Sequence, residues 1–343
     1  MSEEKIRVGI IGAGANTKSK HIPGLQALNN VEIVTVCNRS TESSERVAQE
    51  FKIPNVHKQW YDVIYDPEVD AVVIGTWPYL HASATLLALE HEKHVLCEAR
   101  MAMNAEEAHA MLEASQARPH LVAQLVPSPF TLKVDRVIQR ILAEGHVGTP
   151  LAVEIRDGGA FLDPHAPLHW RQDFDRSGYN MLSLGIWYEC LMRWLGDATD
   201  VMARGKTFVK QRRDEHKMLQ PVRLPDHVDV IAEMACGAQL HMQLSAVTGL
   251  AGPAELFIFG DKGTLRFTDG KVFGAQHGSD HLKEIPVPQE LAGKWRVEEE
   301  FIRAIRGQEQ VKLTTFTDGV KYMEFTEAVF RSIQSGQHVT LPL

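Results

Sequence analysis

The segment Val8-Gly9-Ile10-Ile11-Gly12-Ala13-Gly14 decides the fold, because it joins an apolar strand to a glycine turn. A helix-like stretch follows the turn and ends near Asn30. Gly12 permits a tight reversal of the chain, Gly14 lets the backbone approach a ligand, and the next helix offers the positive end of its dipole. These features favour a pyrophosphate-binding turn. The residues expected to line it are Gly12, Gly14, Ala15, Asn16 and Thr17.

The usual third small residue of such a turn is missing, since Thr17 stands where Gly or Ala is common. The context compensates, because the turn directly follows a Val/Ile run and a second apolar strand is expected at Val31 to Cys37. An ordinary strand-to-helix turn without a ligand remains the alternative at this point.

The length of 343 residues favours two domains over one. A formal net charge of -8, without long basic runs, disfavours a nucleic-acid surface. The first five residues do not resemble a secretory signal, and no stretch approaches the ~20 apolar residues of a membrane span. Cys37, Cys97, Cys190 and Cys236 show neither metal-binding spacing nor a disulfide pattern. We therefore expect a soluble cytoplasmic protein with reduced cysteines, no bound metal, and no membrane or nucleic-acid partner.

Residues 1–125 alternate strand and helix patterns, which predicts an α/β domain with a parallel sheet. Strands are expected at Arg7–Ile11, Glu32–Cys37, Ala71–Gly75, His94–Cys97 and Leu121–Leu125, and helices at Ser43–Phe51 and His81–His91. Such a sheet binds its ligand at the carboxyl ends of its strands. The residues expected there are Asn38, Arg39, Ser40, Thr76, Trp77, Glu98 and Gln124.

Residues 126–343 change, after Gly148-Thr149-Pro150, to strands joined by short glycine-containing turns. This pattern predicts an α+β domain with a large, mainly antiparallel sheet. Strands are expected at Leu151–Arg156, Val228–Met234, Gln239–Ala246, Ala254–Phe259 and Gly263–Phe267, and helices at Leu182–Leu195, Arg296–Ile305 and Asp318–Ser335.

Five different blocks are distinctive: the Gly-Ala-Gly turn with His21-Ile22-Pro23, Asp70 to Thr76 followed by His81, Lys93 to Glu98, Trp170-Arg171, and Gly260 to Leu265. Together they resemble the glucose-fructose oxidoreductase / inositol dehydrogenase / MocA (Gfo/Idh/MocA) family over nearly the whole chain. The resemblance implies a Rossmann domain that carries NAD or NADP, with His81 among the cofactor residues. It also implies an open-faced C-terminal sheet for substrate binding and oligomerisation, hence a homodimer or homotetramer. The reaction implied is oxidation or reduction of a hydroxyl or carbonyl on a sugar, cyclitol or related polyol.

The chemistry of that family is altered in this chain. Relatives usually carry Glu-Lys-Pro where this chain has Glu98-Ala99-Arg100, and their lysine contacts the nicotinamide ribose and the reacting oxygen. Ala99 can neither carry charge nor transfer a proton. Arg100 stays protonated and would be a poor base, but it can hold a developing alkoxide or a substrate carboxylate.

A helix that faces the substrate in relatives differs as well. Relatives commonly carry Asp and, four residues later, His, and the matching positions here are Ser183 and Trp187. Positions i and i+4 share a helix face, so we expect both side chains to point toward the substrate, with the indole stacked on a sugar ring. Tyr179 and Glu189 are candidate replacements for the missing acid-base groups. For Glu189, an ordinary packed or solvated position is an equal alternative.

Histidines of the segment Asp163 to His169 offer another source of acid-base chemistry, because imidazole titrates near neutrality. We favour His169 over His165, since it directly precedes Trp170-Arg171, a stretch that borders the substrate in relatives. Trp170 and Arg171 are accordingly expected to bind substrate. The prolines of this segment disfavour a helical pair of histidines as metal ligands.

The residues after the second strand indicate whether the site prefers NAD or NADP. Sites that select NAD usually place Asp or Glu there, whereas a neutral residue followed by Arg suits a 2′-phosphate. Asn38-Arg39-Ser40 follows the second pattern and favours NADP. The alternative is NAD held through the amide of Asn38 beside a solvated Arg39. One extra residue between Gly14 and His21, relative to the usual family spacing, leaves the shape of the phosphate loop open.

Two classes of function therefore stand. The first is an NAD(P)-dependent oxidoreductase whose acid-base set is rebuilt from Arg100, His169 and either Glu189 or Tyr179. The second is a catalytically inactive nucleotide-binding sensor or partner protein. A related enzyme would use tightly bound NAD to cleave a glycoside by transient oxidation. The fold does not decide among them.

Overall fold

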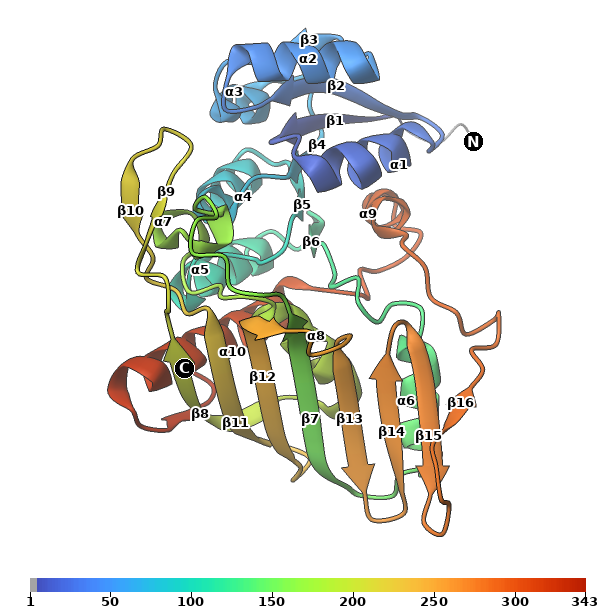
Figure 1. The fold of residues 1–343 in the computed structure, drawn as a ribbon. Helices are drawn as coiled ribbons and strands as arrows, with labels where there is room; N and C mark the ends of the chain where they lie inside the picture. Colours follow the sequence, from blue (N-terminus) through green and yellow to red (C-terminus); the bar gives the residue numbers. More distant parts are fainter. Residues whose placement is uncertain (1–4) are drawn as a thin grey trace. The chain divides into compact units, whose positions relative to one another are not determined.

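A computed structural model of the protein describes residues 5–343; residues 1–4, on which the expected lack of a secretory signal partly rests, lie outside the described residues. The chain divides into two compact units (Figure 1). The first unit comprises Met1–Pro127 and Arg296–Val320, and the second comprises Ser128–Trp295 and Lys321–Leu343. The first unit thus includes a returning segment that lies within the range expected for the second domain.

The sheet of the first unit has six parallel strands in the order β3-β2-β1-β4-β5-β6. Val8, Ile10 and Val72 are completely buried, and such apolar strands are typical of parallel sheets covered on both faces. The strand order reverses between β1 and β4, which creates a crevice at their carboxyl ends. The predicted parallel sheet is confirmed. The strands are β1 (Ile6–Ile11), β2 (Val31–Cys37), β3 (Asn55–Val56), β4 (Ala71–Ile74), β5 (His94–Cys97) and β6 (Ala123–Leu125).

The helices of the first unit include one unusual turn, the π-helix η1 (Thr17–His21), which leads into α1 (Ile22–Gln26). A π-turn contains one residue more than an α-turn, which would fit the one-residue extension expected before His21. The helix α2 (Thr41–Phe51) begins at Ser40, whose side chain accepts a hydrogen bond from the backbone of Ser43. The others are α3 (Trp60–Tyr65), η2 (Pro78–Leu80), α4 (His81–Glu90), α5 (Ala105–Gln116) and α9 (Val297–Ile305).

The sheet of the second unit has nine strands in the order β16-β15-β14-β13-β7-β12-β11-β8-β17 (Figure 1). Only β7 and β12 pair in parallel, so the prediction of a mainly antiparallel sheet is confirmed. Its strands are β7 (Pro150–Gly159), β8 (Ala198–Lys206), β11 (His227–Met234), β12 (Gln239–Gly249), β13 (Glu255–Gly260), β14 (Gly263–Thr268), β15 (Lys271–Gln276), β16 (Lys283–Ile285) and β17 (Val339–Thr340). A separate hairpin joins β9 (Gln211–Arg213) and β10 (Leu219–Pro221).

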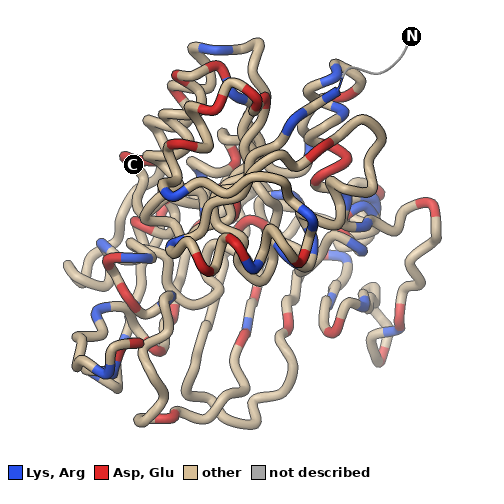
Figure 2. Tube along the Cα trace, turned by 90° about the horizontal axis from the view of Figure 1, so that it is seen from above, with Lys and Arg blue, Asp and Glu red and all other residues tan. Residues whose placement is uncertain are grey.

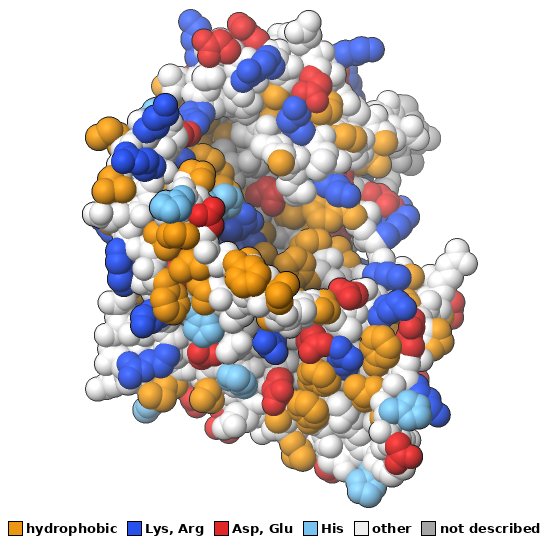
Figure 3. Space-filling model, in the orientation of Figure 1, with side chains coloured by type: hydrophobic (Ala, Val, Ile, Leu, Met, Phe, Trp, Pro, Cys, Tyr) orange, Lys and Arg blue, Asp and Glu red, His pale blue; other side chains and the backbone are white. Residues whose placement is uncertain are grey.

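One face of the nine-stranded sheet is covered and the other is open. Val153 and Ile155 of β7 are buried, whereas Glu154 and Arg156 between and after them are exposed. Helices lie behind the covered face in Figure 1, and the open face in Figure 3 carries hydrophobic, charged and histidine side chains intermixed. The helices of this unit are α6 (Asp135–Ala143), η3 (Trp170–Gln172), α7 (Phe174–Ser177), α8 (Leu184–Leu195) and α10 (Phe316–Ser335), which begins in the first unit.

Acidic and basic side chains are interspersed along the chain (Figure 2). Within residues 5–343, every helix is too short or too polar to span a bilayer.

Candidate functional site

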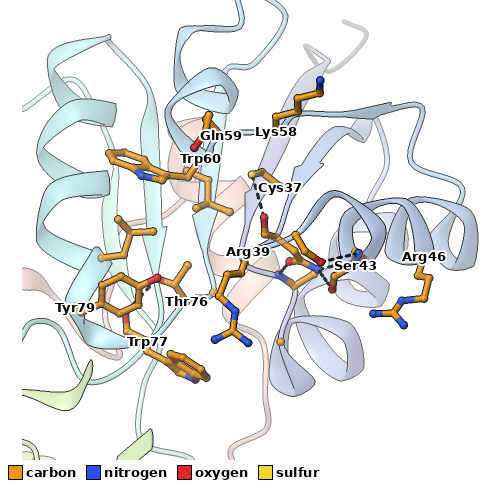
Figure 4. A pocket seen from close by; sticks show the side chains of 18 residues that line it. Cys37, Arg39, Ser43, Arg46, Lys58, Gln59, Trp60, Thr76, Trp77 and Tyr79 are labelled. Carbon is orange, nitrogen blue, oxygen red and sulfur yellow. Dashed lines mark hydrogen bonds between the residues drawn. The ribbon is translucent and has the colours of Figure 1, made fainter. Parts of the chain in front are cut away.

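A pocket of about 560 Å³ lies where β1, β2 and β4 end, in the first unit (Figure 4). Seven of the residues expected to bind a cofactor line it: Gly12, Gly14, Asn38, Arg39, Ser40, Thr76 and Trp77. The other lining residues are Ile11, Ala13, Cys37, Ser43, Arg46, Lys58, Gln59, Trp60, Gly75, Tyr79 and Leu80.

The two glycines of the turn do different work. Gly12 has φ +86°, and a Cβ there would lie 2.6 Å from the Cγ2 of Thr76 and 2.9 Å from the backbone of Gly75. The fold itself therefore requires glycine at this position. A Cβ on Gly14 would meet only the carbonyl oxygen of Gly75, at an ordinary 3.6 Å. Gly14 is thus unnecessary for folding, while its bare backbone lines the pocket, which fits a turn that admits a pyrophosphate.

Thr17 explains how the turn tolerates the missing third glycine. Its hydroxyl donates to the carbonyl oxygen of Gly12 at 3.1 Å, and the residue is buried. The side chain of Thr17 packs closely against Gly75, at the end of the neighbouring strand, where a Cβ would lie 2.1 Å from the Oγ1 of Thr17. Gly75 therefore supplies the small residue that the helix would otherwise provide.

Asn38 connects the glycine turn to helix α2. Its Oδ1 accepts a hydrogen bond from the backbone N–H of Ala13 at 2.6 Å, and its Nδ2 donates to the Oγ of Ser43 at 3.0 Å. Both ends of the amide are thus engaged within the protein. This arrangement fixes the turn against the helix and leaves the side chain of Arg39 as the projecting group.

Three cationic residues, Arg39, Arg46 and Lys58, line the pocket, and none of its described lining residues is acidic. The guanidinium carbon of Arg39 lies 5.5 Å from the ring centroid of Trp77, and Figure 4 shows the two groups side by side. Guanidinium and ammonium groups in a pocket lined by no acidic residue favour an anionic ligand, phosphate above all. Sequence patterns missed Lys58 because the preceding strand, β3, is only two residues long.

Behind the turn, Glu98 belongs to a buried ionic cluster. His21 is completely buried, with Nδ1 2.6 Å from the Oε1 of Glu298 and Nε2 3.0 Å from the Oε1 of Glu98, which also accepts from the amide of Asn16. Burial alone would lower the pKa of His21, but its hydrogen bonds to the two carboxylates outweigh burial and raise the pKa to about 9. Burial alone would raise the pKa of Glu98, but the hydrogen bond and charge of His21 lower it to about 2. The imidazolium therefore stays protonated at neutral pH.

Two other expected cofactor residues connect secondary-structure elements. The ring nitrogens of His81 lie 2.9 Å from the carbonyl oxygen of Arg100 and 3.1 Å from that of Thr76. The amide of Gln124 donates to Glu300 on α9 at 3.2 Å. The expected residues that do not line the pocket are Ala15, Asn16, Thr17, His81, Glu98 and Gln124.

Arg100 follows a cis peptide bond with Ala99 and is half-buried. Its guanidinium forms no ion pair with any residue between 5 and 343, whereas its carbonyl oxygen is held by His81. The side chain is therefore available to an anionic group. Within the described chain, no group of three or more His, Cys, Asp or Glu side chains is arranged to hold a metal ion.

In the second unit, His169 precedes the 3-10 helix η3. Its Nδ1 accepts a hydrogen bond from the backbone N–H of Arg171 at 3.3 Å. The neutral ring therefore carries its hydrogen on Nε2. Partial burial and the charge of Arg171 lower the pKa of His169. The guanidinium of Arg171 lies 4.2 Å from the ring centroid of Trp170, and the ring of His169 lies tilted against the same indole, so the three side chains form one cluster.

Ser183 and Trp187 converge, as their spacing predicts, but on a residue that the sequence patterns did not single out. The hydroxyl of Ser183 donates to the Oδ2 of Asp157 at 2.6 Å, and the indole Nε1 of Trp187 donates to the same oxygen at 2.8 Å. Trp187 is 2% exposed and packs against Phe130, a residue that is 41% exposed. Phe130 is therefore the accessible aromatic ring of this cluster.

Glu189 and Tyr179 are both engaged in packing within the second unit. Glu189 is buried, lies 2.6 Å from the Nη2 of Arg193, and accepts from the backbone of Ser128 at 2.9 Å. The ring of Tyr179 packs on Phe174 and Phe330. These contacts give Glu189 a compensated charge and Tyr179 an aromatic environment, which suits positioning better than proton transfer.

A doubly wound parallel sheet, whose first turn opens into a cation-lined pocket, defines a dinucleotide-binding protein of the Rossmann type. The chain belongs to the GFO/IDH/MocA family: residues 6–124 match the model of the oxidoreductase family with an NAD-binding Rossmann fold, and residues 136–266 match the model of the GFO/IDH/MocA C-terminal domain.

Relatives with sequence similarity include an uncharacterized oxidoreductase of Rhizobium meliloti, 26% identical over 53% of each chain. The 1,5-anhydro-D-fructose reductase of Ensifer adhaerens is 30% identical over 50% of each chain. The chain thus matches about half the length of these two proteins. Inositol 2-dehydrogenase of Burkholderia lata is 23% identical over 92% of this chain and 86% of its own.

Solved structures with the same fold include an oxidoreductase domain protein from Kribbella flavida, with a TM-score of 0.85 and 22% identity over 99% of this chain and 100% of its own. Levoglucosan dehydrogenase in complex with NADH has a TM-score of 0.84 and 21% identity over the same shares of the two chains.

Proposed function

We propose that this protein is an NAD(P)-dependent oxidoreductase that acts on a hydroxyl or carbonyl of a sugar, cyclitol or related polyol. The observation that carries the proposal is the pocket at the ends of β1, β2 and β4. Gly14 lines this pocket although a larger residue would fit the fold there, so its lack of a side chain is best explained by a ligand that contacts the backbone. Family membership supports the redox class. The sugar and cyclitol enzymes among its relatives support the substrate class.

NADP is the cofactor we propose as preferred. Gly12, Gly14 and the turn between them would hold the pyrophosphate, and Arg39, with Ser40, would bind the 2′-phosphate. Arg46 and Lys58 add positive charge to the same pocket, and no acidic side chain among its lining residues offers the ribose contact typical of NAD selectivity. When bound, the nicotinamide supplies the site that accepts or donates a hydride.

The candidate residues outside the cofactor pocket would act on the substrate. Arg100 would stabilise negative charge on the reacting oxygen, because its guanidinium has no ion-pair partner within residues 5–343. His169 would donate from Nε2 to a substrate oxygen, since Nδ1 is engaged with the backbone. Trp170 and Arg171 would contact the polyol beside it.

The test is an initial-rate assay with NADP or NAD and a panel of polyols and aldoses, following reduced cofactor at ~340 nm. Turnover with NADP at a higher kcat/KM than with NAD is the expected result. Cofactor binding without turnover across the panel would overturn the proposal.

A second candidate function, nucleotide binding without net redox chemistry, is favoured by one observation. Ala99 replaces the family lysine, and Ser183 and Trp187 replace its acid-base pair. Such a sensor would bind NADP with the same selectivity and give no reduced cofactor in the assay above.

The open face of the nine-stranded sheet is the surface through which we propose a homodimer or homotetramer. Ile231 and Met202 pair across β11 and β8 and are 52% and 49% exposed on this face. Paired exposed hydrophobic residues on a broad sheet support burial against a second copy.

A further inference from the structure

Asp157, in the second unit, has a carboxylate in which only one of the two oxygens accepts hydrogen bonds from the protein. Oδ2 accepts two hydrogen bonds, from the hydroxyl of Ser183 at 2.6 Å and from the indole of Trp187 at 2.8 Å. Oδ1 has no partner among residues 5–343, and no lysine, arginine or histidine of that range pairs with the carboxylate. The side chain is therefore fixed in place while one oxygen keeps both of its lone pairs.

The position of Asp157 on β7 adds to this contrast. Val153 and Ile155 point to the covered face of the sheet and are buried, and Asp157 is the next residue with the same orientation. It is half-buried near the end of the strand. Placing a charge on a covered face is unfavourable unless donors compensate it, and the two donors present are both neutral. A cationic partner, which Asp157 lacks among residues 5–343, would stabilise the charge more strongly but would make the carboxylate a weaker proton acceptor.

The remaining candidates leave the acceptor role of an alcohol oxidation unfilled. Ala99 cannot take a proton, Arg100 stays protonated, and the neutral ring of His169 presents a hydrogen rather than a lone pair at Nε2. We propose, on the basis of the function proposed above, that Asp157 contacts the substrate and that its Oδ1 accepts the proton of the hydroxyl that is oxidised.

The reaction balances with this assignment. The carbinol C–H bond breaks and its electron pair leaves as hydride to the oxidised nicotinamide cofactor. The O–H bond also breaks, its electron pair forms the second carbon–oxygen bond, and the proton passes to Oδ1 of Asp157 and then to water. Reduction of a carbonyl runs through the same atoms in reverse. Ser183 and Trp187 serve as positioning residues that hold the acceptor from the N-terminal end of α8.

Asp157→Asn separates this role from a structural one. The amide oxygen of asparagine can still accept from Ser183 and Trp187, so a purely structural Asp157 predicts unchanged kinetics. The assignment instead predicts a fall in kcat of ~100-fold or more, with unchanged NADP affinity and circular dichroism. Glu290→Gln, which removes an exposed carboxylate from the same unit, is the control and should keep full activity. Wild-type kcat in D157N would overturn the inference alone, whereas lack of turnover by the unmodified protein would overturn it together with the proposed function.

Ser183→Ala provides a second measurement in case D157N does not fold. It removes one donor to the charged form of Asp157 and should therefore move the acid limb of the kcat/KM profile to higher pH. An acid limb at the wild-type position would contradict proton transfer to Asp157.

Discussion

His21 and Glu98 form a buried ion pair, with the Nε2 of His21 3.0 Å from the Oε1 of Glu98 and the histidine side chain completely buried. Glu298, on the returning helix α9, binds the other ring nitrogen. These three side chains form a clamp within the first unit: the imidazolium of His21 binds Glu98, which directly follows β5, and Glu298, which lies 277 positions from His21 along the chain.

This clamp predicts a specific pH dependence of stability. The folded-state pKa of His21, about 9, lies above its ordinary 6.5, so its contribution to the free energy of unfolding is fully present below pH 6.5 and is lost as the pH rises through 9. The pKa of Glu98, about 2, lies below its ordinary 4.5, so its contribution is present above pH 4.5 and is lost as the pH falls through 2. Denaturant unfolding between pH 6 and 10 measures the loss due to His21. The free energy of unfolding should fall by up to about 3 kcal/mol over this range.

His21→Gln should lower the free energy of unfolding by about 3 kcal/mol at pH 6 and flatten its decline toward pH 10. The reason is that the two carboxylates lose their common partner. His277→Gln, an exposed histidine, is the control and should leave the profile unchanged. A His21→Gln profile parallel to that of the unmodified protein would argue against a protonated His21.

The two glycines of the turn should fail in different ways. Gly14→Val should keep its thermal unfolding midpoint near that of the unmodified protein and weaken NADP binding by ~100-fold or more, because the new side chain occupies the pocket. Gly12→Ala should instead destabilise the protein by about 1–3 kcal/mol, since φ is +86° and the Cβ meets backbone. Calorimetry and NADP titration on both variants check this. Undiminished affinity in Gly14→Val would remove the turn from the cofactor site.

Arg39 and Arg46 should bind the 2′-phosphate of NADP. Arg39→Ala and Arg46→Ala are each expected to weaken NADP binding ~10–100-fold, the effect of losing one charge-assisted hydrogen bond, with little change for NAD. Lys52→Gln, at the opposite end of α2 and outside the lining residues, serves as the charge control. Equal losses for NAD and NADP would count against phosphate recognition.

Ile231→Glu should dissociate the proposed oligomer, because it places a charge on the open sheet face beside Met202. Light scattering coupled to size-exclusion chromatography reports the mass. Leu219→Glu removes a similarly exposed hydrophobic residue from β10, outside this sheet, and should leave the mass unchanged. An Ile231→Glu protein with the mass of the unmodified one would place any interface elsewhere.

The parallel and antiparallel sheets were predictable because the hydrophobic patterns of β1, β4, β11 and β12 are local properties of the sequence. The pocket lining was partly predictable for the same reason, since Asn38, Arg39 and Thr76 directly follow strands. Lys58 was missed because a two-residue strand leaves too short a pattern to detect.

Contacts between distant segments could not be read in this way. Glu298 is separated from His21 by most of the chain, and only the fold brings helix α9 against α1 (Figure 1). Asp157 directly follows the strand expected at Leu151–Arg156, and nothing in its neighbours indicates that Ser183 and Trp187 would both donate to it. Ser183 and Trp187, at the positions where an acid-base pair was expected from the family resemblance, predict altered chemistry, whereas the identity of any replacement group depends on tertiary packing.

Transfer of the substrate hydride tests the central claim most directly. A polyol deuterated at the carbinol carbon is incubated with the protein and NADP, and the reduced cofactor is analysed by mass spectrometry. The account predicts reduced cofactor that carries the deuterium, because the hydride moves directly from carbon to the nicotinamide. Bound NADP that remains fully oxidised, or reduced cofactor without the label, would contradict it.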